Sequence, residues 1–387
     1  MRKKTLLALG LVLAVSMLAA SCTKSSATST GTTGGTTAGG AAPGTGGKAV
    51  GFIFVGPKDD FGYNQAAYDG SQAIAKAYPD MKVVTAENVP ETAEAERVME
   101  DMITKNDAKI IFATSYGHLA AATAVAKRHP DVVVVHQGGL LTDKLPNLGT
   151  YFGTVYEPVY LAGIAAGSAT KSKKLGYVVA FPIPQTLENV NAFELGAQTV
   201  NPDITTTVVF TSNWCDPAKQ AEAAKSLLDQ GVDVITQHQD CTKTIIETTE
   251  AAGKMSVGYH ADASSLAPKG WVTGSQWNWA PLYTDIVKTV LAGQFVGSKY
   301  NADYRVGLQT GDNPFVESKY GTMITADTKT KIEEAKAGLK TKSPFTGPVL
   351  DQSGATKVPA GTTPTYAENE QMDYLVKGVV GSIPAKN

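Results

Sequence analysis

The chain has 387 residues and a formal net charge of −2, from 34 Lys and Arg against 36 Asp and Glu. This balance, with no stripe of basic residues, argues against a nucleic-acid partner. The length exceeds that of one typical domain, and the part from residue 48 onward suits two.

The first 22 residues are predicted to be an export signal. Basic residues at positions 2–4 precede an apolar run over residues 6–20, which is short of the about 20 residues that a membrane span needs. The small residues before Cys22 resemble a bacterial lipobox, in which the cysteine is lipidated and becomes the mature N-terminus. The alternative is plain signal cleavage with Cys22 incidental.

Residues 23–47 are almost entirely Ser, Thr, Gly and Ala. Such a segment cannot bury a core, and we expect a disordered linker with a reach of roughly 25–30 Å. With no second membrane segment in the following residues, the expected product is a globular body on a lipid anchor. We expect it in the bacterial cell envelope, facing outward.

Short apolar segments alternate with helical patterns in the chain that follows. The predicted strands are residues 50–55, 82–85, 110–114 and 132–136, and the predicted helices begin at Asn64 or cover 93–106 and 119–128. This alternation is typical of parallel strands joined by right-handed helical crossovers. The strands are continuous apolar runs, as in sheets that are covered on both faces. The predicted fold class is α/β with doubly wound parallel sheets.

The second half of the chain repeats the pattern of the first. Residues 176–209 echo residues 51–84, with a Gly-led strand, a Pro-bearing loop, a helix that contains a glycine, and then Pro-Asp. Chance similarity between βα units is the alternative, but the matching Gly and Pro-Asp positions weigh against it. We therefore expect two similar lobes.

The chain is expected to cross between these lobes at several strands. Lobe 1 is predicted to comprise residues 48–153 and about 276–306, lobe 2 residues 154–275 and about 307–340, and residues 341–387 a tail that docks on the lobes. Lobes joined in this way enclose a cleft, and closure of a hinge around a ligand is a common motion of such proteins. Small-molecule sites concentrate at domain interfaces and at the carboxyl ends of parallel strands.

Apart from Cys22, the cysteines are Cys215 and Cys241. An exported protein reaches a compartment that permits disulfides, and a bond between these two would make one wall of the cleft rigid. Two free thiols are the alternative, since sequence does not give the separation of the Cα atoms. The five histidines show no ligand spacing, so neither a metal nor a cofactor is predicted.

Candidate ligand-binding residues lie in loops beyond the predicted strands. Aromatic side chains such as Tyr63 and Trp214 can sandwich a planar heterocycle or a sugar face, with plain packing as the alternative. Asp and Asn can recognise ring N–H groups or hydroxyls, because a wrong ligand leaves a buried polar group unpaired. The candidates are Phe61, Gly62, Tyr63, Asn64, Tyr116, Gly117, Trp214, His238, Asp240, Asp262 and Trp277.

Motifs of several enzyme classes are missing from the sequence. There is no P-loop, no GxGxxG after a strand and no GxSxG nucleophile elbow. Asp240 and Asp262 could serve a glycosidase, so an extracytoplasmic hydrolase remains an alternative. Paired carboxylates are also common in polar binding clefts, and we predict a binding protein that is not an enzyme.

Four segments are more specific than generic βα composition. They are GFIFVGPKDDFGYNQ at 51–65, YEPVYLAGIAAG at 156–167, SNWCDPAKQAEAAKSLLDQGVDVITQHQD at 212–240 and MDYLVKGVVGSIP at 372–384. They resemble the basic membrane protein family of bacterial lipoproteins, which are substrate-binding components of ABC transporters. The resemblance implies a type I periplasmic-binding-protein fold, a small solute between the lobes and an ABC permease as partner. We also expect a monomer that contacts the membrane only through its lipid anchor.

The resemblance also suggests roles for individual residues. Phe61, Tyr63 and Asn64 fall in the loop that binds the base in nucleoside-binding members of the family, and Asp262 falls where an Asp holds the ribose. The sequence departs from those members at residues 60–65.

Trp214 and residues 238–240 look more like a branch of the family associated with free purine base, adenine in particular. The predicted ligand is therefore a purine, with a nucleobase ahead of a nucleoside. A receptor for a sugar or a signalling furanose is the alternative.

Overall fold

The computed structural model describes residues 41–311 and 313–385. The expected export signal, Cys22 and the linker up to residue 40 lie outside this range. Contacts group the chain from Ala41 onward into one unit. Within the described part, no helix is both long enough and apolar enough to cross a bilayer.

Residues 41–47 were expected to belong to a disordered linker, and that expectation is wrong. Residues 43–46 form turns, and the Gly44 N–H donates to the Asp131 carbonyl oxygen at 2.8 Å. Gly44 has a positive φ of 76°, which favours glycine, and a Cβ at this position would overlap the Val290 side chain. Composition could not reveal this order, because it depends on close backbone contacts with distant parts of the chain.

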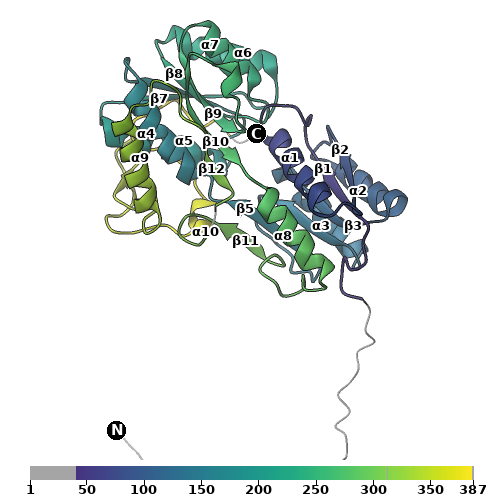
Figure 1. The fold of residues 1–387 in the computed structure, drawn as a ribbon. Coiled ribbons are helices and arrows are strands. Elements are labelled where there is room, and N and C mark those ends of the chain that lie inside the picture. Colours follow the sequence, from purple (N-terminus) through teal and green to yellow (C-terminus); the bar gives the residue numbers. More distant parts are fainter. Residues whose placement is uncertain (1–40, 312, 386–387) are drawn as a thin grey trace, which may run out of the picture. The chain divides into compact units, whose positions relative to one another are not determined.

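Lobe 1 is built on a parallel sheet with the strand order β11-β5-β4-β3-β1-β2 (Figure 1). Its strands are β1 (Ala49–Ile53), β2 (Lys82–Ala86), β3 (Ala108–Ala113), β4 (Val133–Gln137), β5 (Leu148–Gly153) and β11 (Asp303–Val306). Its helices are α1 (Tyr63–Ala77), α2 (Ala93–Asn106), α3 (Leu119–Arg128) and α8 (Ala280–Leu291), with the 3-10 turn η1 (Tyr116–His118) before α3.

Lobe 2 is built on a second sheet with the order β12-β10-β9-β8-β6-β7-β15, in which β12 runs antiparallel to β10. Its strands are β6 (Lys174–Val179), β7 (Thr205–Phe210), β8 (Val234–His238), β9 (Met255–His260), β10 (Trp271–Trp277), β12 (Phe315–Glu317) and β15 (Val379–Val380). Its helices are α4 (Tyr156–Ala169), α5 (Pro184–Val200), α6 (Pro217–Asp229), α7 (Lys243–Ala251) and α9 (Ala326–Leu339), with η2 (Ser264–Leu266) after β9.

The order β2-β1-β3-β4-β5 of lobe 1 corresponds to β7-β6-β8-β9-β10 of lobe 2. The echo in the sequence is therefore a repeat in the structure. In both lobes the strand order reverses beside the first strand, which is where doubly wound sheets bind ligands.

Aromatic packing fixes the crossing from lobe 2 back to lobe 1. Phe52 of β1 and Phe112 of β3 stack with ring centroids 4.4 Å apart. Tyr283 of α8 packs on both rings, at 5.4 and 4.9 Å. Helix α8 follows β10 of lobe 2 in the chain, and these contacts seat it on lobe 1.

Helix starts follow local signals in the sequence. The Asp216 carboxylate accepts hydrogen bonds from the N–H groups of Ala218 and Lys219, both at 3.1 Å, and Pro217 occupies the first position of α6. The Thr92 hydroxyl likewise caps α2 by accepting from Glu94 N–H. These caps fix where the loops end at the carboxyl edges of the sheets.

The tail after α9 docks on lobe 2. It contains β13 (Val349–Leu350), β14 (Thr356–Val358) and α10 (Tyr366–Asn369) before β15. The Asn191 side chain of α5 donates to the Tyr374 carbonyl oxygen and accepts from the Val376 N–H, both at 2.9 Å. Strand β15 then pairs in parallel with the outer edge of β7.

Candidate functional site

The carboxyl ends of β1 and β8 face each other across the two lobes. The Tyr63 N–H donates to the Asp240 carbonyl oxygen at 3.0 Å, and the Thr242 N–H donates to the Asp60 carbonyl oxygen at 3.3 Å. A Cβ at Gly62 would overlap the Asp240 carbonyl oxygen. The loop after β1 and the loop after β8 are therefore in direct contact, and we take this interface as the candidate ligand site.

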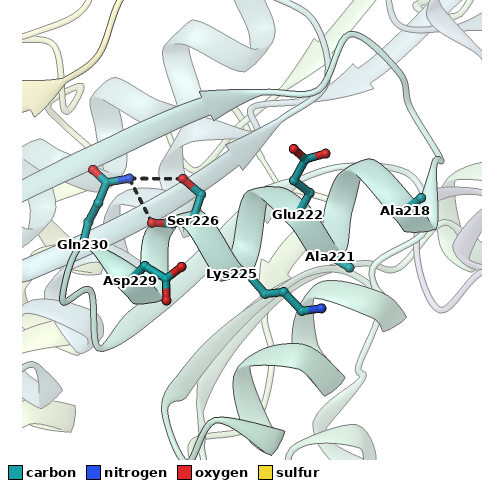
Figure 2. Close-up of a pocket in the computed structure, with 7 residues that line it drawn as sticks. All are labelled: Ala218, Ala221, Glu222, Lys225, Ser226, Asp229 and Gln230. Carbon is teal, nitrogen blue, oxygen red and sulfur yellow. Dashed lines mark hydrogen bonds between the residues drawn. The ribbon is translucent and has the colours of Figure 1, made fainter.

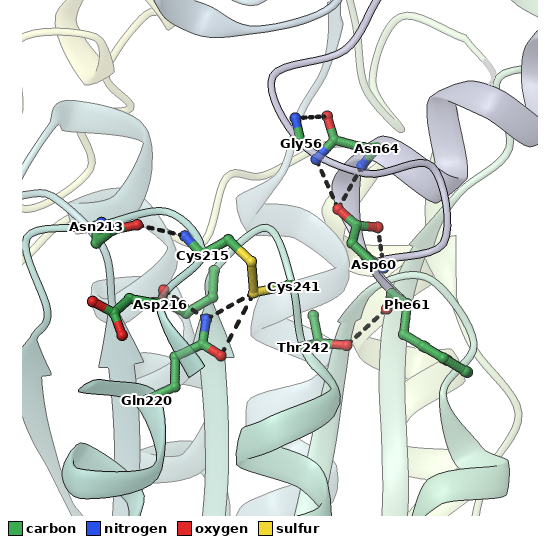
Figure 3. The surroundings of a disulfide bond; sticks show 12 residues. Gly56, Asp60, Phe61, Asn64, Asn213, Cys215, Asp216, Gln220, Cys241 and Thr242 are labelled. Carbon is green, nitrogen blue, oxygen red and sulfur yellow. Dashed lines mark hydrogen bonds between the residues drawn. A yellow bond between two sulfur atoms is a disulfide. The ribbon is translucent and has the colours of Figure 1, made fainter. Parts of the chain in front are cut away.

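The loop after β1 is organised by the buried carboxylate of Asp60 (Figure 3). One oxygen accepts from the N–H groups of Gly62 at 2.8 Å and Gln65 at 3.0 Å. The other accepts from the Asn64 N–H at 3.0 Å and its side-chain amide at 2.7 Å. Asn64 also accepts from the Gly56 N–H. The Asn64 side chain is thus occupied in shaping the loop, although the sequence suggested that it binds ligand.

Aromatic rings form the wall of the interface nearest the hinge. The Tyr63 ring lies 4.8 Å from the His260 ring, measured between centroids, and the Trp277 indole N–H donates to His260 Nδ1 at 2.9 Å. Trp277 stacks on Trp279 at 4.2 Å and 14° between planes. Trp277 is therefore fixed by the hinge packing, while Tyr63 enters the interface from lobe 1.

Asp240 brings a buried carboxylate to this interface. The residue is only 6% exposed, and its carboxylate has no hydrogen-bond partner among the described residues. Burial raises the pKa of Asp240 well above its ordinary value, and the nearby negative charges of Asp60 and Glu91 raise it further. A carboxyl group that is largely shielded from water and receives no hydrogen bond from the protein favours a ligand that presents hydrogen-bond donors.

Amide and imidazole groups complete the polar lining. The Gln137 oxygen accepts from the Tyr283 and Tyr151 hydroxyls, at 2.8 and 3.1 Å. Within the part of the chain that the structure describes, several buried polar atoms near this interface have no partner. They are Gln137 Nε2, Gln185 Nε2, Asn189 Oδ1 and His260 Nε2. Both donors and acceptors are thus available, which suits a small polar ring system.

His238 lies at the end of β8 on the lobe 2 side of the interface. Its Nδ1 lies 3.0 Å from the Asn189 amide nitrogen, which can only donate. Burial lowers the pKa of His238 to about 3, so the ring is neutral at pH 7 with its proton on Nε2. Neutral His238 can therefore join the lining without adding positive charge beside Asp240.

The structure does not bring every candidate from the sequence to this interface. Asp262 is exposed, accepts from the Ser264 N–H at 3.0 Å and pairs with Lys319 at 3.4 Å. Burial acts to raise the pKa of Asp262, but the Ser264 hydrogen bonds and Lys319 outweigh it and lower the pKa. Gly117 is also exposed, and its N–H donates to Glu91 at 2.8 Å.

Two aromatic candidates lie at the margins of the interface. Trp214 is half-buried, with its ring 5.2 Å from Phe181 and 6.1 Å from His238. Tyr116 is also half-buried and lines a surface hollow of about 740 Å³. Phe61 packs against a buried cluster of lobe 2.

Glu91 and Asn189 bear on the site but were not among the candidates from the sequence. Glu91 follows β2, and its charge acts on Asp240. Asn189 lies on α5 four residues after Gln185, on the same face of the helix. Both carried a usable signal, since Glu91 is in a loop after a strand and Asn189 is on the first turns of the helix that follows a strand end.

Cys215 and Cys241 form a disulfide between the loops after β7 and β8 (Figure 3), with their Cα atoms 5.2 Å apart. The residues before them are also joined, because the Asp240 N–H donates to the Trp214 carbonyl oxygen at 2.9 Å. The Gln220 amide of α6 contacts Cys241 Sγ at 3.3 Å. The disulfide therefore supports the loop that carries Asp240.

A second hollow, of about 570 Å³, lies on the exposed side of α6 (Figure 2). Glu222, Lys225 and Asp229 line it, and all its lining residues come from one helix and the residue after it. No second element encloses a ligand there. Among the described residues, no group of three or more His, Cys, Asp or Glu is arranged to hold a metal ion.

Comparison with known proteins identifies the family. A family described as ABC transporter substrate-binding protein, PnrA-like (Bmp), matches residues 48–340. A purine-binding protein of Brucella abortus is 35% identical over 87% of this chain and 93% of its own length. A Haloferax volcanii protein, provisionally named as an ABC transporter glucose-binding protein, is 30% identical over 86% of this chain and 81% of its own length.

Solved structures show the same fold at lower identity. An ABC transporter solute-binding protein of Aeropyrum pernix aligns with a TM-score of 0.67 and 19% identity, over 84% of this chain and 95% of that one. Another solute-binding protein, from Conexibacter woesei, aligns with a TM-score of 0.61 and 20% identity, over 75% and 95% of the two chains. The predicted α/β fold class is confirmed as the type I periplasmic-binding fold. With the predicted family also confirmed, the chain belongs to the Bmp family of ABC transporter substrate-binding proteins.

Proposed function

We propose that this protein binds a purine at the interlobe interface and delivers it to an ABC permease. The observation that carries the proposal is the carboxyl group of Asp240, which lies in the loop that Tyr63 contacts and receives no hydrogen bond from a described residue. A purine offers N–H donors to such a carboxyl group, ring nitrogens to the amide donors Gln137 and Gln185, and a flat face to an aromatic side chain. The purine-binding relative in Brucella abortus supports the same ligand class.

A free base such as adenine is proposed ahead of a nucleoside. The residue that the family resemblance assigns to ribose, Asp262, is exposed and paired with Lys319. Its oxygen Oδ1 also accepts from the Ser264 N–H. A ribose would have to compete with these contacts, whereas a base alone needs only the groups around Tyr63 and Asp240.

The proposed location is outside the cytoplasm, on a lipid anchor at Cys22. The support is the export signal and the lipobox-like residues before Cys22 in the sequence. Mass spectrometry of the protein recovered from bacterial membranes tests this proposal. A diacylated N-terminal cysteine is the expected product, and an unmodified mature N-terminus elsewhere would refute the anchor.

A panel of ligands tests the proposed specificity. Thermal unfolding is measured with adenine, guanine, hypoxanthine, their nucleosides, glucose and ribose. A ligand present at 100 times its dissociation constant stabilises the protein by about 2.7 kcal/mol. We expect adenine to give the largest shift and glucose none. A shift with glucose but with no purine would refute the proposal and favour the sugar specificity named for the Haloferax volcanii relative.

The same samples test for hydrolysis. A nucleoside that gives a thermal shift is incubated with the protein and recovered by chromatography. Recovery of the unchanged nucleoside is expected of a binding protein, and release of free base would show that the protein is a hydrolase.

A further inference from the structure

Phe61 and Tyr63 are two residues apart, but their rings lie in different surroundings. The Tyr63 ring faces His260 in the candidate site. The Phe61 ring packs against a buried cluster of lobe 2 that comprises Ile246 of α7, Ala263, Ala267 and Trp271. Phe61 also has a positive φ of 54°, which is uncommon for a residue with a bulky side chain. An apolar side chain of lobe 1 thus packs on lobe 2.

Thr242 meets Phe61 from the other side of the interface. Its hydroxyl donates to the Phe61 carbonyl oxygen at 2.7 Å, and its N–H donates to the Asp60 carbonyl oxygen at 3.3 Å. Thr242 is fully buried and precedes α7, yet its side chain does not cap that helix. The hydroxyl therefore serves the contact between lobes and not the stability of its own helix.

The chain links these two residues closely to the candidate site. Phe61 is two residues from Tyr63, and Thr242 is two residues from Asp240. Between them, Gly62 packs on the Asp240 carbonyl group without space for a side chain. Any shift of the Phe61–Thr242 contact would therefore move Tyr63 relative to Asp240.

We propose that Phe61 and Thr242 form an interlobe latch, which holds the two lobes closed and positions Tyr63 and Asp240 without touching the ligand. The latch combines one partly buried hydrogen bond with the packing of one aromatic ring on lobe 2, and Lys243 adds a cation 5.7 Å from the centre of that ring. The role of Phe61 is then different from the base-stacking role that its position in the sequence suggests. The ligand region is taken from the proposed function, but formation of the latch does not depend on which solute binds.

The distance between the lobes in the full-length protein tests the latch directly. Spin labels are attached at Lys76 of α1 and Lys225 of α6, two exposed positions on different lobes. Double electron–electron resonance then gives the distribution of distances between the two labels, with and without adenine. We expect Phe61→Ala and Thr242→Val to move the distribution toward longer distances.

Matched controls separate the latch from local packing. Leu266→Ala removes an apolar side chain that packs on the same cluster but belongs to lobe 2 itself. Thr249→Val removes a buried hydroxyl from the same helix, where it bonds to the Ile245 carbonyl oxygen. Neither control is expected to change the distribution. Equal shifts in a control and in its matched variant would overturn the proposal.

Kinetics give a second readout. Loss of the hydrogen bond to Phe61 in Thr242→Val should raise the dissociation rate of adenine about fivefold, and Phe61→Ala should raise it at least tenfold. A large loss of adenine affinity in Phe61→Ala with an unchanged distance distribution would make Phe61 a ligand contact and refute the latch. The latch would also be refuted if the wild-type protein showed no short distances between the labels, both with and without adenine. If adenine does not bind, the ligand-free distributions still decide.

Discussion

The Asn189 side-chain amide lies 3.0 Å from His238 Nδ1 and 2.6 Å from the Tyr259 hydroxyl oxygen. All three side chains are buried. Because the amide nitrogen can only donate, His238 must accept with Nδ1, and a protonated imidazole would lose this bond. The hydrogen bonding of Asn189 in the candidate site therefore depends on the protonation of His238.

Stability should depend on pH through His238. Burial lowers its pKa to about 3 in the folded state, against about 6.5 in the unfolded chain. The unfolded state binds the extra proton between these values, so stability falls as pH decreases from about 6.5 to 3. The difference in free energy of unfolding between wild type and His238→Gln, from urea titrations, should shrink by about 1.4 kcal/mol for each pH unit below 6. Parallel pH curves would contradict this prediction.

Asp240 should act in the opposite direction. Its folded pKa is raised, mainly by burial, so the folded state binds the proton more tightly than the unfolded chain. This stabilising contribution is present below about pH 4 and is lost as pH rises through the raised pKa. Asp240→Asn should therefore be more stable relative to wild type at pH 7 than at pH 4.

Ligand binding should separate Asp240 from Asp262. Calorimetric titration with adenine should show at least tenfold weaker binding for Asp240→Asn. Asp262→Asn, the same change at the exposed residue paired with Lys319, should bind like wild type. The reverse pattern would show that the ligand contacts Asp262 and not Asp240, and it would favour a ribose-containing solute.

Gly62→Ala should block closure of the lobes. A methyl group at this position would overlap the Asp240 carbonyl oxygen, so the ligand affinity should fall by about a hundredfold or more, since this overlap involves rigid backbone. Each lobe should still fold, because the overlap arises only where the lobes meet. Gly338→Ala is the control, since a methyl group there contacts nothing within 4 Å. Near-wild-type affinity in Gly62→Ala would show that the interlobe contact does not form in solution.

Loss of the disulfide should weaken both folding and binding. The bond joins residues 26 apart, and the loop-closure entropy corresponds to a loss of about 3.5 kcal/mol in the free energy of unfolding. A Cys215→Ser and Cys241→Ser double variant should also bind adenine more weakly, because the loops of Trp214 and Asp240 lose their covalent tie. Reductant should reproduce both effects in wild type and change nothing in the double variant.

The sequence predicted the elements of the site better than the directions of its side chains. Strand ends were recognisable as apolar runs followed by turn residues, and the structure has Tyr63, His238 and Asp240 at the carboxyl edges of the sheets, with Tyr63 as the first residue of α1 and His238 as the last residue of β8. Phe61 and Asp262 occupy similar loops, yet their side chains lie elsewhere. Phe61 has a positive φ, and Asp262 forms an ion pair with Lys319. Neither feature can be predicted from the hydrophobic periodicity of strands or helices.

Other features were out of reach because they depend on contacts between distant parts of the chain. The order of residues 41–47 rests on the contact of Gly44 with Asp131. Asn189 gains its role from His238 and Tyr259, which are 49 and 70 residues away. Composition and periodicity describe a segment by itself and cannot report such partners.

The pairing of β15 with β7 has a consequence for solubility. Without β15, β7 would be the edge strand of the lobe 2 sheet, and its free backbone groups would form a template for other chains. Val379 and Val380 occupy that edge and leave only a two-residue strand outside. A protein shortened before residue 372 would therefore be expected to self-associate, even though its ligand-binding residues are intact.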